Sequence, residues 1–229
     1  MSPELPRFDC GNFRTRNKED FAEIYCNAEE LMPHRIPTPR GRSVITTAYV
    51  DASHASNQVT RRSHSGYALF LNWVPAAWYS KRQYTVETGT VSSEEFIALK
   101  VCPLEAIKHL RFKLQCFGVP LLQGEPPTYV FSDNESAVRN TTKVESTLNK
   151  KHSSVAYHHC RWSVAAGVIT FANTSSHENI ADCFTKQVTL ATRTYLFGQW
   201  IFLMAKPYPA WVLVRLWGDQ VNSTTVLLS

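Results

Sequence analysis

The sequence predicts an α/β fold in which three antiparallel strands come first and helices alternate with further strands after them. Two observations lead to this prediction. Between residues 43 and 86, three β-rich segments are joined by short links, and after residue 92 the apolar side chains recur at helical spacing. The composition agrees with a packed globular protein, because 44% of the residues are hydrophobic and 19% are charged.

The first half of the predicted domain is an antiparallel meander. The segment "SVITTAYVDAS" (43–53) is rich in β-branched residues and ends near Asp51. The segments "SGYALFLNWV" (65–74) and "AAWYSKRQYTV" (76–86) follow, with a short turn predicted at 72–75. Strands linked so closely pair in antiparallel fashion, and we expect the first one to be central in the sheet and poorly solvated.

The second half alternates helices with strands. A long helix is predicted to begin at Ser92 or Ser93 and to stop at Gly118, and Pro103 should kink it or divide it into two abutting helices. The remaining predicted elements are, in order, a strand at 128–133, a helix from Asn134, a helix at 147–167, a strand at 168–173 and a helix at 176–186.

Three regions of the chain differ in composition. Residues 1–43 are rich in charge and proline, and we expect this lead-in to link or to wrap without contributing to a core. Residues 44–190 form the predicted domain. Residues 191–229 are predicted to be a C-terminal helix and an irregular tail.

Charge and cysteine use narrow the class of protein. The formal net charge of +5 and the pI near 8.9 would suit a polyanionic partner, but they are weak evidence alone. The six cysteines include no CxxC pair and no zinc-ligand spacing, so we expect reduced thiols. We see no signal peptide, and the apolar stretch at 195–205 is too short to span a bilayer. We therefore expect an intracellular protein, in a cytoplasmic particle or the nucleus, with no membrane partner.

Four acidic residues occupy informative places in this order of elements. Asp51 ends the first strand, Glu95 lies in the first turn of the long helix, Asp133 ends a later strand, and Asp182 lies in the last predicted helix. Strand ends that lie side by side under helix faces can bring such carboxylates together. Divalent cations would relieve their mutual repulsion, and two Mg²⁺ ions about 3.5 to 4 Å apart can promote hydrolysis of a phosphodiester. The quartet therefore predicts a nuclease site.

Each acid also has a simpler interpretation. Asp133 could cap the helix that follows it, and we expect it to cap that helix as well as to bind metal. Glu95 and Asp182 could be solvated acids in the first turns of their helices. Asp51 is harder to explain as a turn former, because its strand should be central.

Six motifs occur in order along the chain. They are "YVDASHASNQVTRRSHSGY", "AAWYSKRQYTVET", "EEFIALK", "VFSDNESAV", "KKHSSVAYHHCR" and "NIADCFTK". Together they resemble the ribonuclease H domain of copia-type retrotransposon polyproteins. The resemblance covers roughly residues 44–190, and "PTPRGRSV" resembles the stretch that precedes this domain in the family.

The resemblance implies a ribonuclease H-like fold, with a five-stranded mixed sheet of three antiparallel strands and then parallel ones, flanked by helices. It implies hydrolysis of the RNA strand of RNA/DNA hybrids with two Mg²⁺ ions, for which Mn²⁺ is an expected substitute. The family's catalytic, metal-binding carboxylates correspond by position to Asp51, Glu95, Asp133 and Asp182. His177 corresponds to a mobile histidine that assists proton transfer or product release, although it could equally be an ordinary exposed histidine. The reverse transcriptase domain of the same polyprotein is an expected partner.

Departures from the family pattern leave alternatives open. Glu94 adjoins Glu95 in a segment one residue longer than usual, so either could face the metals, although the position before Phe96 favours Glu95. Pro103 interrupts a helix that the family leaves unbroken, and the tail after residue 205 is irregular. The alternative is a catalytically decayed remnant that keeps the fold and only binds nucleic acid or a reverse-transcriptase partner. An integrase-type recombinase is disfavoured, because its Glu comes last in the chain and here the Glu comes second.

Basic side chains near the predicted cleft would supply the phosphate contacts that position a duplex without reading its sequence. We expect this role for Arg61, Arg62, Lys81, Arg82, Lys150 and Lys151. Trp78 could stack on the substrate, but we expect it to be a core residue.

Overall fold

The structure is a computed structural model. It describes residue 21 and residues 23–53, 62–72, 74–83, 103–121, 127–146 and 154–198. The predicted N-terminal part of the long helix and most of the predicted tail lie outside these ranges.

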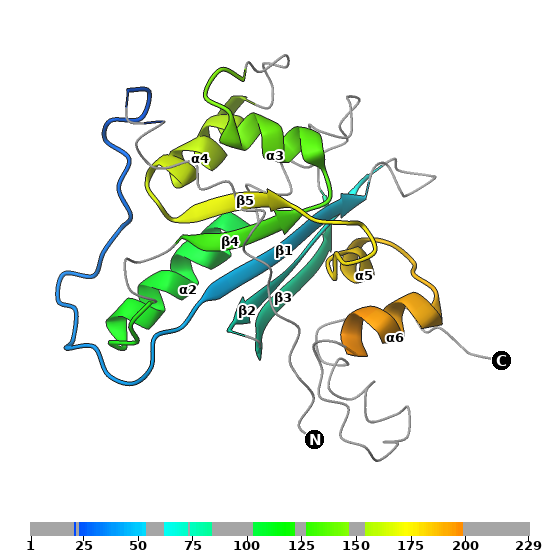
Figure 1. Cartoon of the computed structure of the whole chain (residues 1–229), viewed down its shortest axis with the longest axis horizontal. Coiled ribbons are helices and arrows are strands. Elements are labelled where there is room, and N and C mark those ends of the chain that lie inside the picture. The colour runs from blue at the N-terminus through cyan, green and yellow to red at the C-terminus, as the bar shows by residue number, and fades with distance from the viewer. Residues whose placement is uncertain are drawn as a thin grey trace.

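A five-stranded mixed sheet forms the centre of the fold (Figure 1). Its strands are β1 (Thr46–Ser53), β2 (His64–Leu71), β3 (Val74–Arg82), β4 (Thr128–Ser132) and β5 (Ile169–Asn173). The order across the sheet is β3-β2-β1-β4-β5. The strands β1, β2 and β3 pair in antiparallel fashion, whereas β4 pairs in parallel with both β1 and β5. The predicted five-stranded mixed sheet, with three antiparallel strands and then parallel ones, is confirmed, and β1 lies in its centre.

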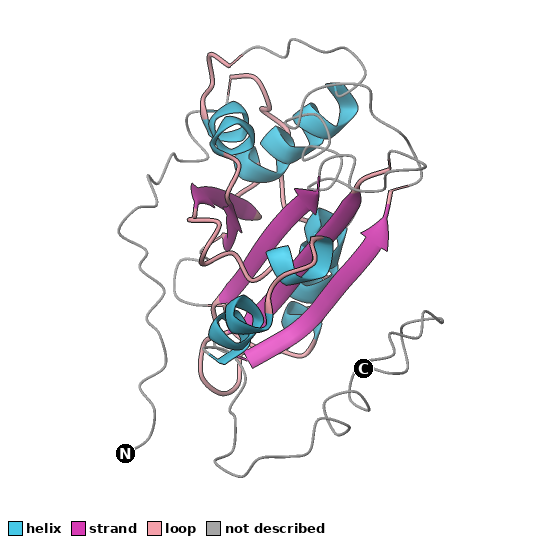
Figure 2. Cartoon of the chain, turned by 90° about the vertical axis from the view of Figure 1, so that its right-hand side faces the viewer, coloured by secondary structure: helices cyan, strands magenta, loops and turns pink. Residues whose placement is uncertain are grey.

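Helices cover both faces of this sheet (Figures 1 and 2). The described helices are α2 (Glu105–Cys116), α3 (Glu135–Thr142), α4 (Ser154–Ala165), α5 (Asp182–Thr185) and α6 (Leu190–Gly198). The larger hydrophobic core joins one face of the sheet to α2, α3 and α4, and the smaller core joins the other face to the α5 region and α6. All eight residues of β1 are buried, because helices pack on both sides of it.

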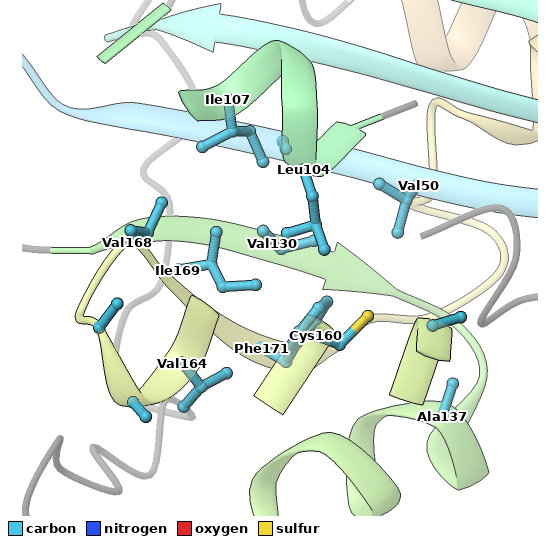
Figure 3. Packing of buried hydrophobic residues seen from close by; sticks show 14 of the residues in the cluster. Val50, Leu104, Ile107, Val130, Ala137, Cys160, Val164, Val168, Ile169 and Phe171 are labelled. Atoms are coloured by element: carbon cyan, nitrogen blue, oxygen red, sulfur yellow. The ribbon is translucent and has the colours of Figure 1, made fainter. Parts of the chain in front are cut away.

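The alternation of side chains along β1 divides them between the two cores. Val50 packs in the larger core and the neighbouring Tyr49 packs in the smaller one. Figure 3 shows Leu104, the N-cap of α2, and Ile107 in its first turn beside Val50 and Val130 of the sheet. This packing fixes the position of the strand that carries Asp51.

The helix after β4 begins one residue later than predicted. Its N-cap is Asn134, whose side-chain oxygen accepts a hydrogen bond of 2.9 Å from the backbone N–H of Ala137. The prediction that Asp133 caps this helix is therefore wrong. Because Asn134 satisfies the first turn, the carboxylate of Asp133 is free to point elsewhere.

Pro103 stands at the start of the described part of the long helix. From Glu105 the helix α2 runs unbroken to Cys116, and Gly118 follows with a φ of 66°, as the predicted stop requires. The prediction that Pro103 kinks or divides the long helix depends on residues before 103 that lie outside the described ranges, so it stays a prediction. The expected N-cap, Ser92 or Ser93, lies outside the described residues.

The lead-in contributes to the core, contrary to expectation. Phe21 is fully buried in the larger core, and its ring lies 5.0 Å from the guanidinium carbon of Arg161 in α4. Glu30 forms a two-pronged ion pair with Arg111, whose side chain is fully buried in α2. A buried guanidinium needs a partner of opposite charge, and the lead-in supplies it. In Figure 1 this segment, in blue, passes from α4 towards α2.

Candidate metal centre

Three carboxylates meet near the C-terminal ends of the central strands β1 and β4. Asp51 lies in β1, Asp133 directly follows β4, and Asp182 is the first residue of α5. One oxygen of each lies within 4.8 Å of the others. Among the residues that the structure describes, this is the group with the geometry to hold a metal ion.

The register of the sheet brings Asp51 and Asp133 together. The parallel pairing of β1 with β4 ends at Val50 and Ser132, the residues directly before these two acids. The sequence analysis placed the end of this strand at Asp51. In the structure β1 continues to Ser53, paired with β2. Asp51 thus lies within a rigid strand, and its side chain is only 2% exposed.

A close approach of α5 to β2 brings the third carboxylate to the site. Gly66 pairs with Asp51 across the sheet, and a Cβ at Gly66 would lie 2.8 Å from side-chain carbons of both Phe184 and Thr185. Real side chains do not tolerate such contacts, so only glycine lets α5 lie this near the sheet. On β3, the hydroxyl of Ser80 donates a hydrogen bond to the backbone carbonyl of Phe184.

The loop before α5 is anchored to the same strand and to the same acids. The amide of Asn179 donates to the carbonyl of Val50 at 3.0 Å, and its oxygen accepts from the backbone N–H of Ala181 at 3.1 Å. Ser176 donates a hydrogen bond of 2.9 Å to Asp133. Thr185 donates a short hydrogen bond to Asp51. Hydroxyl groups from this loop and from α5 therefore orient the carboxylates of Asp133 and Asp51.

Lys186 is a member of the site that the sequence analysis missed. Its ammonium lies 2.9 Å from Asp182 and 3.5 Å from Asp51. The four-residue spacing from Asp182 was a signal for this contact, because residues four apart on a helix are neighbours. The hydroxyls of Thr185 and Ser176 carried no such signal, since nothing local in the sequence specifies their contacts with distant acids.

Burial and the crowding of negative charge shift the pKa values of the groups in the site. Burial raises the pKa of Asp51, and Asp133 adds to the rise, although Thr185 and Lys186 oppose it. Burial and the charge of Asp51 raise the pKa of Asp182 to about 6, against the opposing effect of Lys186. Burial lowers the pKa of Lys186, but Asp51 and Asp182 outweigh it and the net shift is upward. The pocket thus favours added positive charge.

Other predicted catalytic residues have different outcomes. Glu95 and its neighbour Glu94 lie outside the described residues, so the fourth ligand stays a prediction. His177 is exposed in the loop before α5, one residue after Ser176, which contacts Asp133. Its role in proton transfer or product release also stays a prediction.

The structure describes some of the predicted phosphate-binding residues. Arg61, Lys150 and Lys151 lie outside the described ranges. Arg62 is half-buried, and Lys81 and Arg82 are exposed on the edge strand β3.

The pairing of Ser80 with Gly66, and of Gly66 with Asp51, shows on which face of the sheet Lys81 and Arg82 each lie. Arg82, two residues after Ser80, shares the face of the carboxylates, whereas Lys81 points to the opposite face. Trp78, predicted to be a core residue, is 50% exposed on this edge strand, so that prediction is wrong.

Within the described residues, no helix combines the length and apolar character needed to cross a membrane.

Comparison with known sequences bears on the family. No protein-family model matches the chain. Over 157 residues, 68% of this chain, it is 27% identical to the retrovirus-related Pol polyprotein from transposon RE1 of Arabidopsis thaliana and 28% identical to that from transposon RE2. The predicted resemblance to retrotransposon Pol polyproteins is confirmed. The match spans 10% of the length of each of these relatives.

Solved structures to which the chain is similar include ribonucleases H. RNase H1 from the halophilic archaeon Halobacterium salinarum NRC-1 has a TM-score of 0.44 and 16% identity, covering 61% of this chain and 93% of that one. LC11-RNase H1, crystallised with an RNA/DNA hybrid, has a TM-score of 0.41 and 18% identity over the same shares. The protease-reverse transcriptase of prototype foamy virus has a TM-score of 0.37 and 12% identity, covering 72% of this chain and 21% of that one.

Proposed function

We propose that this chain is a retrotransposon-derived ribonuclease H that hydrolyses the RNA strand of RNA/DNA hybrids with two divalent metal ions. The observation that carries the proposal is the meeting of Asp51, Asp133 and Asp182 within 4.8 Å, where the central strands β1 and β4 lie beside α5. Three separate parts of the chain converge there, against the repulsion of their charges.

The donor set fits Mg²⁺, with Mn²⁺ as a substitute. Carboxylate oxygens are the hard ligands that Mg²⁺ prefers. Burial and neighbouring carboxylates raise the pKa values of Asp51 and Asp182, so a bound cation would favour their charged forms. Asp51, Asp133 and Asp182 would hold the ions, with Glu95 as the predicted fourth ligand. Two such ions, when bound, supply an activated water and a stabilised leaving oxygen.

The protein's own residues orient these ligands and the substrate. Ser176 and Thr185 fix the rotamers of Asp133 and Asp51 by donating hydrogen bonds to them. Arg82, exposed on the carboxylate face of β3, would contact a phosphate of the hybrid and so position the duplex. In our proposal His177 assists proton transfer or product release.

The proposal extends to the reverse transcriptase domain as a partner of this chain. The chain matches a tenth of the length of Pol polyproteins, so we propose that the reverse transcriptase domain of the same polyprotein helps to hold the substrate. An intracellular location, in a cytoplasmic particle or the nucleus, is the setting in which such a hybrid would arise.

Hydrolysis of a labelled RNA/DNA hybrid in MgCl₂ tests the proposal. We expect the chain to cut the RNA strand and Asp133→Asn to lose activity by about 100-fold or more, as when a charge-stabilising group is removed from an active site. Glu145→Gln, an exposed acid outside the site, is the matched control and should cut normally.

The opposite result would favour the decayed remnant. A folded chain that binds the hybrid in a salt-sensitive manner, but leaves it uncut in both MgCl₂ and MnCl₂, would overturn catalysis and support nucleic-acid binding alone.

A further inference from the structure

Lys186 lies against the same carboxylates that would hold the metal ions. Its ammonium contacts Asp182 at 2.9 Å and Asp51 at 3.5 Å. The side chain of Lys186 is 41% exposed, whereas those of Asp182 and Asp51 are 13% and 2% exposed. The ammonium of Lys186 therefore lies on the solvent side of two acids that are themselves largely buried.

An ammonium in this position neutralises part of the carboxylate cluster. It cannot keep both contacts once divalent cations bind the same oxygens, because the like charges would then lie within a few ångströms of one another. Lysine is suited to leaving, since its long flexible stem lets the charged group move into water while the backbone stays in place. Thr185, by contrast, is buried and remains attached to Asp51.

We propose that Lys186 is a positioning residue that acts as the counter-ion of the ion-free pocket and yields Asp51 and Asp182 to the incoming metal. It keeps the acids together before the metal arrives, and by competing for their oxygens it lowers the affinity of the site for divalent ions. This inference rests on the proposed function, because it needs the cluster to be a metal site.

A purely structural ion pair would behave in the opposite way. If Lys186 only held α5 in place, its removal would loosen Asp182 and weaken metal binding. If it competes with the metal, its removal strengthens metal binding even though the ion-free protein becomes less stable. The direction of the change in affinity therefore separates the two roles.

Mn²⁺ binding to the full chain, without substrate, is the test. Electron paramagnetic resonance of free Mn²⁺ should show that Lys186→Met and Lys186→Gln bind the ion roughly tenfold more tightly than the unaltered chain, a usual size for coupling between two sites. Both variants should melt at a lower temperature in EDTA and gain more from added Mn²⁺. Lys113→Met, an exposed lysine of α2, is the matched control and should change none of these values.

Chemical labelling tests the same point in the unaltered chain, in case the variants fold poorly. Acetylation followed by mass spectrometry should show Lys186 becoming more reactive as Mg²⁺ is added, while Lys113 stays constant. Equal or weaker Mn²⁺ binding by the variants, or an unchanged reactivity of Lys186 at saturating Mg²⁺, would overturn this inference alone. Absence of any divalent-ion binding by the unaltered chain and both variants would overturn the proposed function with it.

Discussion

The pKa of Asp182 reflects the burial and the charges of the site. Its pKa is raised from 3.8 to about 6 by burial and by Asp51. An acid with a raised pKa in the folded state binds more protons there than in the unfolded chain. The free energy of unfolding therefore falls as the pH rises through the interval between these two values.

We expect Asp182→Asn to remove part of this pH dependence in EDTA. Because Asn does not titrate, the variant should lose less stability between pH 4 and pH 7 than the unaltered chain, with a difference of about 1 kcal/mol after allowance for solvent screening. Urea unfolding at several pH values measures how the free energy of unfolding changes with pH, with Glu145→Gln as the control. If the free energy of unfolding of Asp182→Asn changed with pH as it does in the unaltered chain, the pKa of the Asp182 carboxyl would not be raised by the fold.

Residues 133 and 134 mark one limit of sequence-based prediction. Asp133 and Asn134 both follow β4, and either residue type can cap a helix. The choice depends on backbone angles, since Asn134 has the extended conformation of a cap and receives the N–H of Ala137. The metal-ligand role assigned to Asp133 depended on distant acids, and it stays a prediction, with Asp133 placed beside Asp51 and Asp182.

At the scale of elements, the strands were predicted well because they carry local signals. The β-branched and aromatic runs of β1, β2, β4 and β5 lie within a few residues of their predicted limits. The segment around Asp182 was harder, because a predicted helix of 176–186 became an anchored loop and the four-residue helix α5. Contacts with the sheet, which hydrophobic spacing does not reveal, decide this geometry.

The contact between α5 and β2 provides a prediction at this scale. We expect Gly66→Ala to destabilise the fold by about 1 to 3 kcal/mol, the usual cost of overpacking. Its methyl group would meet Phe184 and Thr185. Since α5 carries Asp182 and leads into Lys186, the displacement should also weaken Mn²⁺ binding.

Urea unfolding and Mn²⁺ titration measure these two effects of Gly66→Ala. Gly198→Ala is the matched control, because a Cβ there meets nothing within 4 Å. If Gly66→Ala left both quantities unchanged, α5 would not depend on the close approach.

At the scale of the whole molecule, the limits of the domain differ from those that composition predicts. Charge and proline made residues 1–43 look like a linker. Only the fold shows that Phe21 fills the core beneath α4 and that Glu30 pairs with Arg111 of α2. Sequence analysis could not pair Glu30 with a residue 81 positions away, because no periodicity connects them.

Shortening the chain to residues 44–229 tests this view of the domain. The deletion leaves the fully buried Arg111 without its partner, which costs about 3 to 5 kcal/mol, and the loss of the Phe21 ring adds a cost of similar size. Together these approach the whole stability of a typical domain, about 5 to 15 kcal/mol, so the shortened chain should be largely unfolded by circular dichroism. A chain of residues 20–229, which keeps both Phe21 and Glu30, should fold normally. Arg111→Met in the shortened chain should restore part of the loss, because it removes the unpaired charge, whereas an unaltered urea midpoint for residues 44–229 would contradict the role of the lead-in.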